Sequence, residues 1–227
     1  MTNPGNPGNP GNPGNPYARL AAAAAEWDEL HPRLAPATLD RLALLLAALR
    51  TADGEAAERA ALLAARLLGE QLPDRFPGES RLAATPEAPA AGHLGFSADD
   101  LAVLVLDGHR MVGPVLGEVR DRLLAAPSVG DAEALEGGCD PYAPGLIRLH
   151  GAGGLVRLPA FQFTADGRPR AVVLEVNALL DADHDPWGAA DWWLSPNVWL
   201  DDTPARLLGT PQQQRLVTAA QFLIEGE

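Results

Sequence analysis

The stretch Asp181–Trp187, with the sequence DADHDPW, gathers three aspartates and one histidine within five positions. Carboxylates bind hard cations such as Ca²⁺ and Mg²⁺, and imidazole binds zinc and other divalent transition metals, so these side chains are candidate metal ligands. Their spacing, however, fits neither the calcium loop of an EF-hand nor a zinc motif. Asp185 directly precedes Pro186, which is the pattern of a helix cap before a proline at the first helical position. The sequence therefore predicts an acidic loop between helices and no metal site.

Nucleophilic and phosphate-binding patterns are the other chemistry to consider. Ser195 is not part of a Gly-x-Ser-x-Gly elbow, and the proline that follows it predicts a turn. Cys139 would need an activating histidine, and the five histidines follow no catalytic or metal-binding spacing. The glycine-rich HGAGG at 150–154 has no following lysine and begins no helix, so it predicts a hairpin turn. We expect no catalytic residue, no cofactor and no enzyme activity.

Four arginines form the one local basic cluster that the sequence suggests. Arg148 and Arg157 lie in the two arms of an expected hairpin, and Arg168 and Arg170 follow in DGRPR. Guanidinium groups bind phosphate of a nucleic acid or carboxylates of a partner protein. The alternative is a solvated strand face, which we favour over contact with nucleic acid.

The overall charge and the cysteine count restrict the class of protein further. The chain of 227 residues has a formal net charge of −13, which repels nucleic acid at long range and suits a basic partner protein. A single cysteine fits a reducing compartment. No run of about 18 apolar residues is present, and the start lacks the features of a signal peptide. We expect a cytoplasmic protein without a membrane segment.

The chain is expected to divide into five segments. They are a disordered Asn-Pro-Gly repeat leader (1–16), an Ala/Leu-rich helical region (17–72), a Pro/Gly-rich linker (73–96), a helical segment (97–145), and a β-hairpin with a helical domain (146–227). This predicts a mainly α fold, with an N-terminal helical bundle, a linker, and an α-helical domain that carries a small β-hairpin.

The helices of the first half follow from leucine spacing and capping residues. Helices are expected over Ala21–Leu30, over Thr38–Arg50 with Thr38 as its cap, and over Glu55–Leu72, where Leu62, Leu63, Leu67 and Leu68 form the apolar stripe. Ser97 and Asp100 form a capping box that opens a helix to about Leu106. With a second helix over Pro114–Ala126, the pattern allows a degenerate helix-turn-helix and equally a hairpin of helices without DNA function.

The second half is expected to begin with strands and to continue with helices. After a loop over 129–145, alternating residues predict a hairpin of Leu146–Leu149 with Leu155–Leu158. Helices are then expected at Val172–Leu180, Pro186–Leu194, Pro204–Leu208 and Pro211–Ile224, and the last three each begin with a capping residue and a proline.

The C-terminal third carries a recognisable series of motifs. They are Trp193-Leu194, Pro196-Asn197, Leu200, Thr203-Pro204 and Leu207-Leu208, followed by a closing helix with Val217, Leu223, Ile224 and Gly226. In this respect residues 155–227 resemble the toxin-binding domain of the Xre/MbcA/ParS antitoxin family. Asp201 and Asp202 stand where that family often has glycines.

The resemblance implies a binding protein. Antitoxins of this family bind a RES-domain toxin that consumes NAD and block the entrance to its active site with their C-terminal segment; many form dimers and repress their own operon. The expected partner-binding residues are Trp192, Asn197, Trp199, Arg206, Phe222, Ile224 and Gly226, whereas Trp193 is expected in the core. Two alternatives stay open: a DNA-binding regulator that uses residues 97–126 and the hairpin arginines, and an adaptor or assembly protein that reuses the domain.

Overall fold

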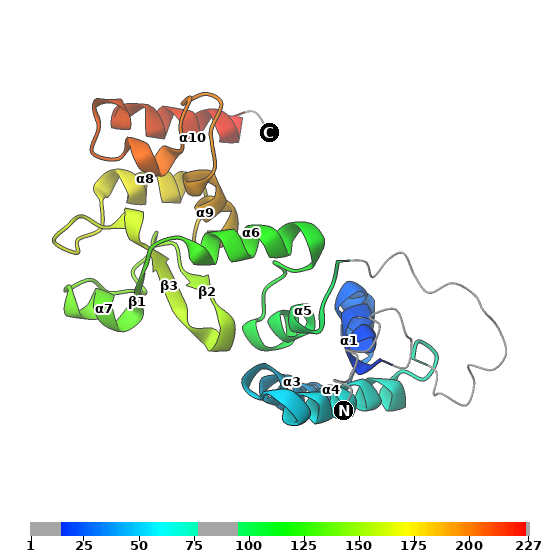
Figure 1. Ribbon diagram of the computed structural model, residues 1–227. Coiled ribbons are helices and arrows are strands. Elements are labelled where there is room, and N and C mark those ends of the chain that lie inside the picture. Colours follow the sequence, from blue (N-terminus) through cyan, green and yellow to red (C-terminus); the bar gives the residue numbers. More distant parts are fainter. Residues whose placement is uncertain (1–14, 77–94, 226–227) are drawn as a thin grey trace, which may run out of the picture. The chain divides into compact units, whose positions relative to one another are not determined.

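The computed structural model describes residues 15–76 and 95–225 (Figure 1). In these residues it is mainly helical, with ten α-helices and a three-stranded antiparallel sheet, which confirms the expected fold class. The chain divides into two compact units, Met1–Glu118 and Val119–Glu227. Most of the expected leader, most of the expected linker and Gly226 lie outside the described residues.

The first unit is built from helices. They are α1 (Pro16–Ala25), α2 (Trp27–Leu30), α3 (Pro36–Thr51), α4 (Gly54–Gln71), α5 (Ala98–Ala102) with the π-helical turn η4 (Val103–Asp107), and the start of α6 (Gly113–Ala125). A short 3-10 turn, η1 (His31–Arg33), follows α2. The unit boundary falls within α6.

Local capping explains where several of these helices begin. Asn15 accepts a hydrogen bond from the Tyr17 amide at 3.0 Å, so the last Asn-Pro of the repeat starts α1, earlier than the expected Ala21. Thr38 is not the cap of α3, because Pro36 occupies the first turn and Ala35 the cap position. The capping box before α5 is confirmed: Ser97 Oγ accepts from the Asp100 amide at 3.1 Å, and Asp100 Oδ2 accepts from the Ser97 amide at 2.9 Å.

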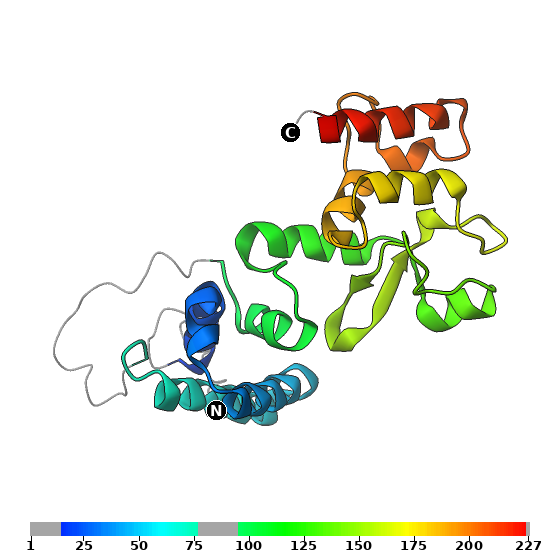
Figure 2. The same ribbon diagram turned by 180° about the vertical axis from the view of Figure 1, so that it is seen from behind.

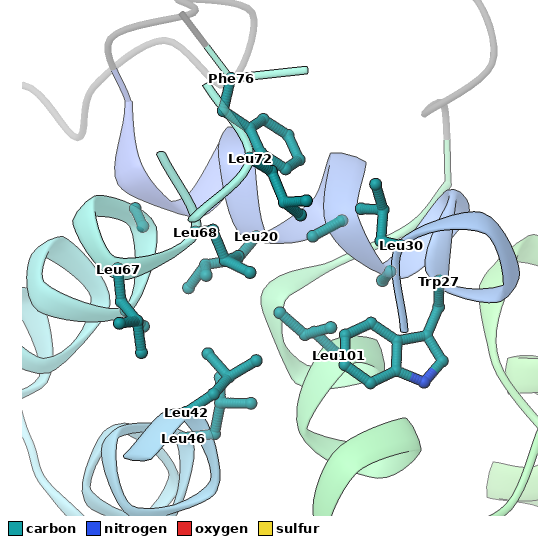
Figure 3. Packing of buried hydrophobic residues seen from close by; sticks show 14 of the residues in the cluster. Leu20, Trp27, Leu30, Leu42, Leu46, Leu67, Leu68, Leu72, Phe76 and Leu101 are labelled. Atoms are coloured by element: carbon teal, nitrogen blue, oxygen red, sulfur yellow. The ribbon is translucent and has the colours of Figure 1, made fainter. Parts of the chain in front are cut away.

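One apolar core holds the described helices of the first unit together. In Figure 3 leucines from α1, α3 and α4 point toward one another, with Trp27 of α2 and Leu101 of α5 beside them. Helix α4 packs on α1 and α3. Its buried face consists of four alanines and two leucines, namely Ala60, Ala61, Ala64, Ala65, Leu67 and Leu68. Leu62 and Leu63, which were expected in this stripe, are 57% and 50% exposed. The alanine face lets neighbouring helices approach closely, and the two leucines therefore point outward.

Helix α5 belongs to the first unit. Leu101 and Ala102 are buried in the same core as the leucines of α1, α3 and α4. The structure therefore divides the segment expected over 97–145: its first helix packs with the N-terminal helices, and the boundary between units comes at 118 and 119.

The second unit combines a small sheet with helices (Figure 2). After the end of α6 come β1 (Ser128–Gly130), α7 (Asp131–Glu136), β2 (Leu149–His150), β3 (Val156–Pro159), α8 (Ala171–Leu179), α9 (Pro186–Leu194) and α10 (Arg215–Glu225). Four 3-10 turns connect them, η5 (Ala152–Gly154), η6 (Ala160–Gln162), η7 (Pro204–Leu207) and η8 (Pro211–Gln214). Helix α10 lies alongside α8 in both views.

The sheet confirms the expected hairpin and adds a strand to it. Strand order is β1-β3-β2, with Leu149 opposite Arg157 and Val129 opposite Leu158, both antiparallel. The expectation of a loop over 129–145 is wrong, since β1 enters that range and α7 occupies Asp131–Glu136. A strand of three residues is too short for a periodic pattern, and its pairing depends on a partner far along the chain.

The expected helices of the C-terminal part are found with small changes. Helix α9 spans Pro186–Leu194 as expected, whereas the segment from Pro204 and the first turn from Pro211 are 3-10 turns. Within the described ranges, no helix has both the length and the apolar character that crossing a membrane requires.

Candidate protein-binding surface

Trp193 anchors the centre of the second unit, as expected. Its side chain is fully buried, and its indole Nε1 donates to Asn177 Oδ1 of α8 at 2.8 Å. The ring lies 5.1 Å from that of Phe161 and meets Trp192 edge-on, also at 5.1 Å between centroids. Because a buried tryptophan needs a partner for its N–H group, this hydrogen bond fixes how α9 lies against α8.

A buried polar network surrounds this contact. Asn177 Nδ2 donates to the Gly145 carbonyl at 2.7 Å, and Gln162 bridges both backbone polar atoms of Ile147, at 2.7 and 3.0 Å. Both amide side chains are fully buried. Sequence reasoning missed them, although a polar residue within each of the apolar runs LPAFQF and VLEVNALL was a usable signal.

The loop after α9 presents Trp199 in a fixed conformation. Asn197 Oδ1 accepts from the Trp199 amide at 3.0 Å, and the Asn197 amide donates to the Asp202 carbonyl at 3.0 Å. From α10, Arg215 Nη2 donates to the Trp199 carbonyl at 2.7 Å. These bonds hold the backbone of the loop, while the Trp199 side chain stays 52% exposed. Sequence reasoning missed the role of Arg215.

The end of α10 carries the exposed apolar side chains that complete this surface. Leu216, Ala219 and Ala220 are buried, and helical spacing continues their stripe to Leu223 and Ile224, which are 41% and 47% exposed. The stripe therefore extends beyond the part of the unit that covers it. The ring of Phe222 lies 6.4 Å from that of Trp199 and so joins the loop to the helix.

We call this set the C-terminal apolar surface. Its members are exposed apolar side chains of one loop and one helical turn, namely Val198, Trp199, Phe222, Leu223 and Ile224. The rings of Trp199 and Phe222 lie beside each other in it, and exposed apolar groups that gather in a patch mark interaction sites.

The expected partner-binding residues do not all belong to it. The structure brings Asn197, Trp199, Phe222 and Ile224 to this surface. Trp192 lies in α9, half-buried against Trp193, and its ring belongs to that cluster. The expected residue Arg206 is 77% exposed in η7 and lies 3.8 Å from Asp202. The expected Gly226 lies outside the described residues.

The acidic DADHD stretch is occupied by local interactions. His184 Nδ1 lies 2.7 Å from Asp181 Oδ1, and this hydrogen bond raises the pKa of His184 above its ordinary 6.5. Asp183 accepts from Arg148 at 3.1 Å, and Asp185 Oδ1 caps α9 by accepting from the Gly188 amide at 2.8 Å. Within the described residues, no three carboxylate, imidazole or thiol groups are placed to hold a metal ion.

The four candidate nucleic-acid arginines each have an acceptor within the chain. Arg148 also donates to the Ala143 carbonyl at 2.9 Å, and Arg157 donates to the Leu124 carbonyl at 3.3 Å. Arg168 pairs with Asp166, and Arg170 donates to the Phe163 carbonyl at 3.0 Å. These guanidinium groups tie loops to their neighbours, which accounts for arginine at these positions.

The two nucleophile candidates are a buried thiol and a hydroxyl that is hydrogen-bonded within its own helix end. Cys139 is buried, and burial, with Asp140 as a second cause, raises the pKa of its thiol, which disfavours the reactive thiolate. Ser195 Oγ donates to Asp191 Oδ1 one turn earlier at 2.9 Å, at the end of α9.

The chain was also compared with known proteins. No protein-family model, no curated protein and no solved structure matches it. A proposal of function therefore has to be argued from the residues and contacts described above, and from the resemblance of the motifs in residues 155–227 to an antitoxin toxin-binding domain.

Proposed function

We propose that this protein is an antitoxin-like inhibitor, which binds a NAD-consuming RES-type toxin through its C-terminal unit and neutralises it. The observation that carries the proposal is the C-terminal apolar surface, in which Trp199 and the last turn of α10 are exposed together. We place this function in the cytoplasm, in keeping with the single cysteine of the chain.

The end of α10 has the shape of a plug more than that of a flat contact face. Phe222, Leu223 and Ile224 are consecutive, and successive helical residues point about 100° apart, so the three side chains cover roughly 200° of the helix. A flat partner surface would cover only part of this arc. A concave pocket covers all of it, and because the three side chains are about half exposed, burying each contributes about 1–1.5 kcal/mol. An active-site entrance is such a pocket.

The fixed loop supports tight binding for a second reason. Asn197 and Arg215 already hold the backbone of Trp199, so binding does not have to order this segment. Tryptophan is also the side chain most enriched among residues that dominate interface energies. The net charge of −13 adds attraction for a basic partner and speeds association.

Co-purification and enzyme inhibition test the proposal directly. The full chain is produced together with a RES-domain toxin, and binding and NAD consumption are measured. We expect a stable complex and suppressed NAD consumption. Trp199→Ala and Phe222→Ala should each weaken binding by about 10- to 100-fold, the range typical of hot-spot residues.

A matched control separates this surface from exposed apolar residues in general. Leu135 of α7 is 60% exposed in the same unit, and Leu135→Ala should leave affinity unchanged. Circular dichroism of all variants checks that they fold. A toxin that neither binds nor loses activity, or equal affinity for all three variants, would contradict the proposal.

The two alternatives gain less support. A DNA-binding regulator would need free cationic groups, and the four hairpin-region arginines donate to acceptors of the chain itself. An adaptor or assembly protein would use the same C-terminal apolar surface on another partner, or in a homodimer. Size-exclusion chromatography with light scattering of the chain alone would identify a dimer that forms without the toxin.

A further inference from the structure

Asp201 has an unusual backbone conformation. Among the described residues, only Asp201 and Asp181 have positive φ without being glycine, at 54° and 53°. This region is open to glycine and disfavoured for residues with a Cβ atom, although aspartate tolerates it better than most. Nine glycines occupy the other described positions of this kind.

The two aspartates differ in what their carboxylates do. Asp181 holds the imidazole of His184 at 2.7 Å, so its side chain has a use within the chain. The Asp201 carboxylate is exposed and, within the part of the chain that the structure describes, has no hydrogen bond or ion pair. It lies two positions after Trp199 in the same loop.

The loop itself imposes the backbone of Asp201. Asn197 and Asp202 are bonded across the loop, and Leu200 donates to the Asn197 carbonyl at 3.2 Å, so position 201 must turn between fixed neighbours. Glycine would satisfy this conformation with less strain. Strain that persists at an exposed position without an internal contact points to a function outside the chain.

We infer that Asp201 is a specificity-determining residue, whose carboxylate pairs with an arginine or lysine of the partner at the rim of the pocket that receives Trp199. This inference rests on the proposed function. Neighbouring charges have acceptors or donors in the chain: Asp202 lies 3.8 Å from Arg206, and Arg215 donates to the Trp199 carbonyl and to Gln212. Of the two carboxylates of this loop, Asp201 is therefore the one left for the partner, which is a protein with an apolar pocket and a cationic rim.

The test measures affinity and thermal stability of full-length variants, with the same RES-domain toxin as the probe. Asp201→Asn removes the charge and keeps a residue that tolerates positive φ, whereas Asp201→Gly also relieves strain. Both should weaken binding by about tenfold, chiefly through slower association, and should reduce the dependence of affinity on salt. Asp201→Gly should raise Tm by about 2 °C.

Asp181→Asn is the matched control, because it removes a carboxylate from the same backbone conformation at a different loop. Its affinity for the toxin should equal that of the wild type. Equal affinity of the Asp201 variants would overturn the role of Asp201 and leave the proposed function standing. If Asp201→Gly weakened binding while Asp201→Asn did not, the effect would come from loop rigidity and not from the charge. A lower Tm of Asp201→Gly would show that the backbone of Asp201 is not strained. Either result would overturn the inference. A wild-type chain that binds no toxin would remove the proposed function and this inference together.

Discussion

Replacing Asn177 should destabilise the second unit strongly, although this residue is not one of those expected to bind a partner protein. Asn177 is fully buried and connects three segments of the chain: its Oδ1 accepts from Trp193 Nε1 at 2.8 Å, and its Nδ2 donates to the Gly145 carbonyl at 2.7 Å. Leucine has a similar size and no polar atoms. Asn177→Leu therefore removes the hydrogen bonds without opening a large cavity.

The expected magnitude follows from the groups that lose their partners. The Trp193 N–H group would be left buried and unbonded, at about 1–3 kcal/mol, and the part-buried Gly145 carbonyl would lose a hydrogen bond worth about 0.5–1.5 kcal/mol. Asn177→Leu should therefore lower the free energy of unfolding by about 2–4 kcal/mol. Trp193→Phe removes the same indole bond and part of the ring. In the double variant that bond is lost only once, so the combined loss should be about 1–2 kcal/mol less than the sum of the single losses.

Urea denaturation with two probes measures this effect. Four of the five tryptophans lie in the second unit, so fluorescence reports mainly on its unfolding, whereas circular dichroism reports on the helices of both units. The fluorescence midpoint should fall in Asn177→Leu. Glu175→Leu is the control, because Glu175 is exposed on the same helix, and it should change stability by less than about 0.5 kcal/mol.

Two results would refute this reasoning. An Asn177→Leu protein as stable as Glu175→Leu would mean that the network does not hold α8 against α9. Full additivity in the double variant would mean that Asn177 and Trp193 act independently, despite the hydrogen bond between them.

Further predictions concern a histidine, a cysteine and a helix cap. NMR titration should give His184 a pKa above 6.5, because Asp181 stabilises its charged form, and Asp181→Asn should lower this pKa toward its ordinary value. The stability from this pair is present below pH 6.5 and is lost as pH rises through the raised pKa. Cys139 should react with a thiol reagent slowly at neutral pH and rapidly in urea, because burial raises its pKa and shields it. Ser97→Ala should lower the free energy of unfolding by about 1 kcal/mol, whereas Thr203→Ala, at a cap position without a side-chain bond, should not lose a capping contribution.

The sequence alone determined the helix starts that depend on neighbouring residues. Asp185 before Pro186 predicts the first residue of α9, and Ser97 with Asp100 predicts the capping box of α5. In both cases the side chain and the amide that it satisfies are three residues apart, so the interaction can be recognised in the order of residues. The apolar spacing likewise predicts α3 and α4 with nearly correct ends.

Tertiary structure decided which apolar side chains are buried and which polar ones join them. Helical spacing could not choose between the leucine and alanine faces of α4, because both are apolar and only the packing of α1 and α3 selects one. The bond from Trp193 to Asn177 joins residues 16 apart, and the Trp199–Phe222 contact joins a loop to a later helix. Such contacts exist only after the chain has folded back on itself. The sequence could thus name Trp199 and Phe222 separately, whereas the fold placed their rings side by side.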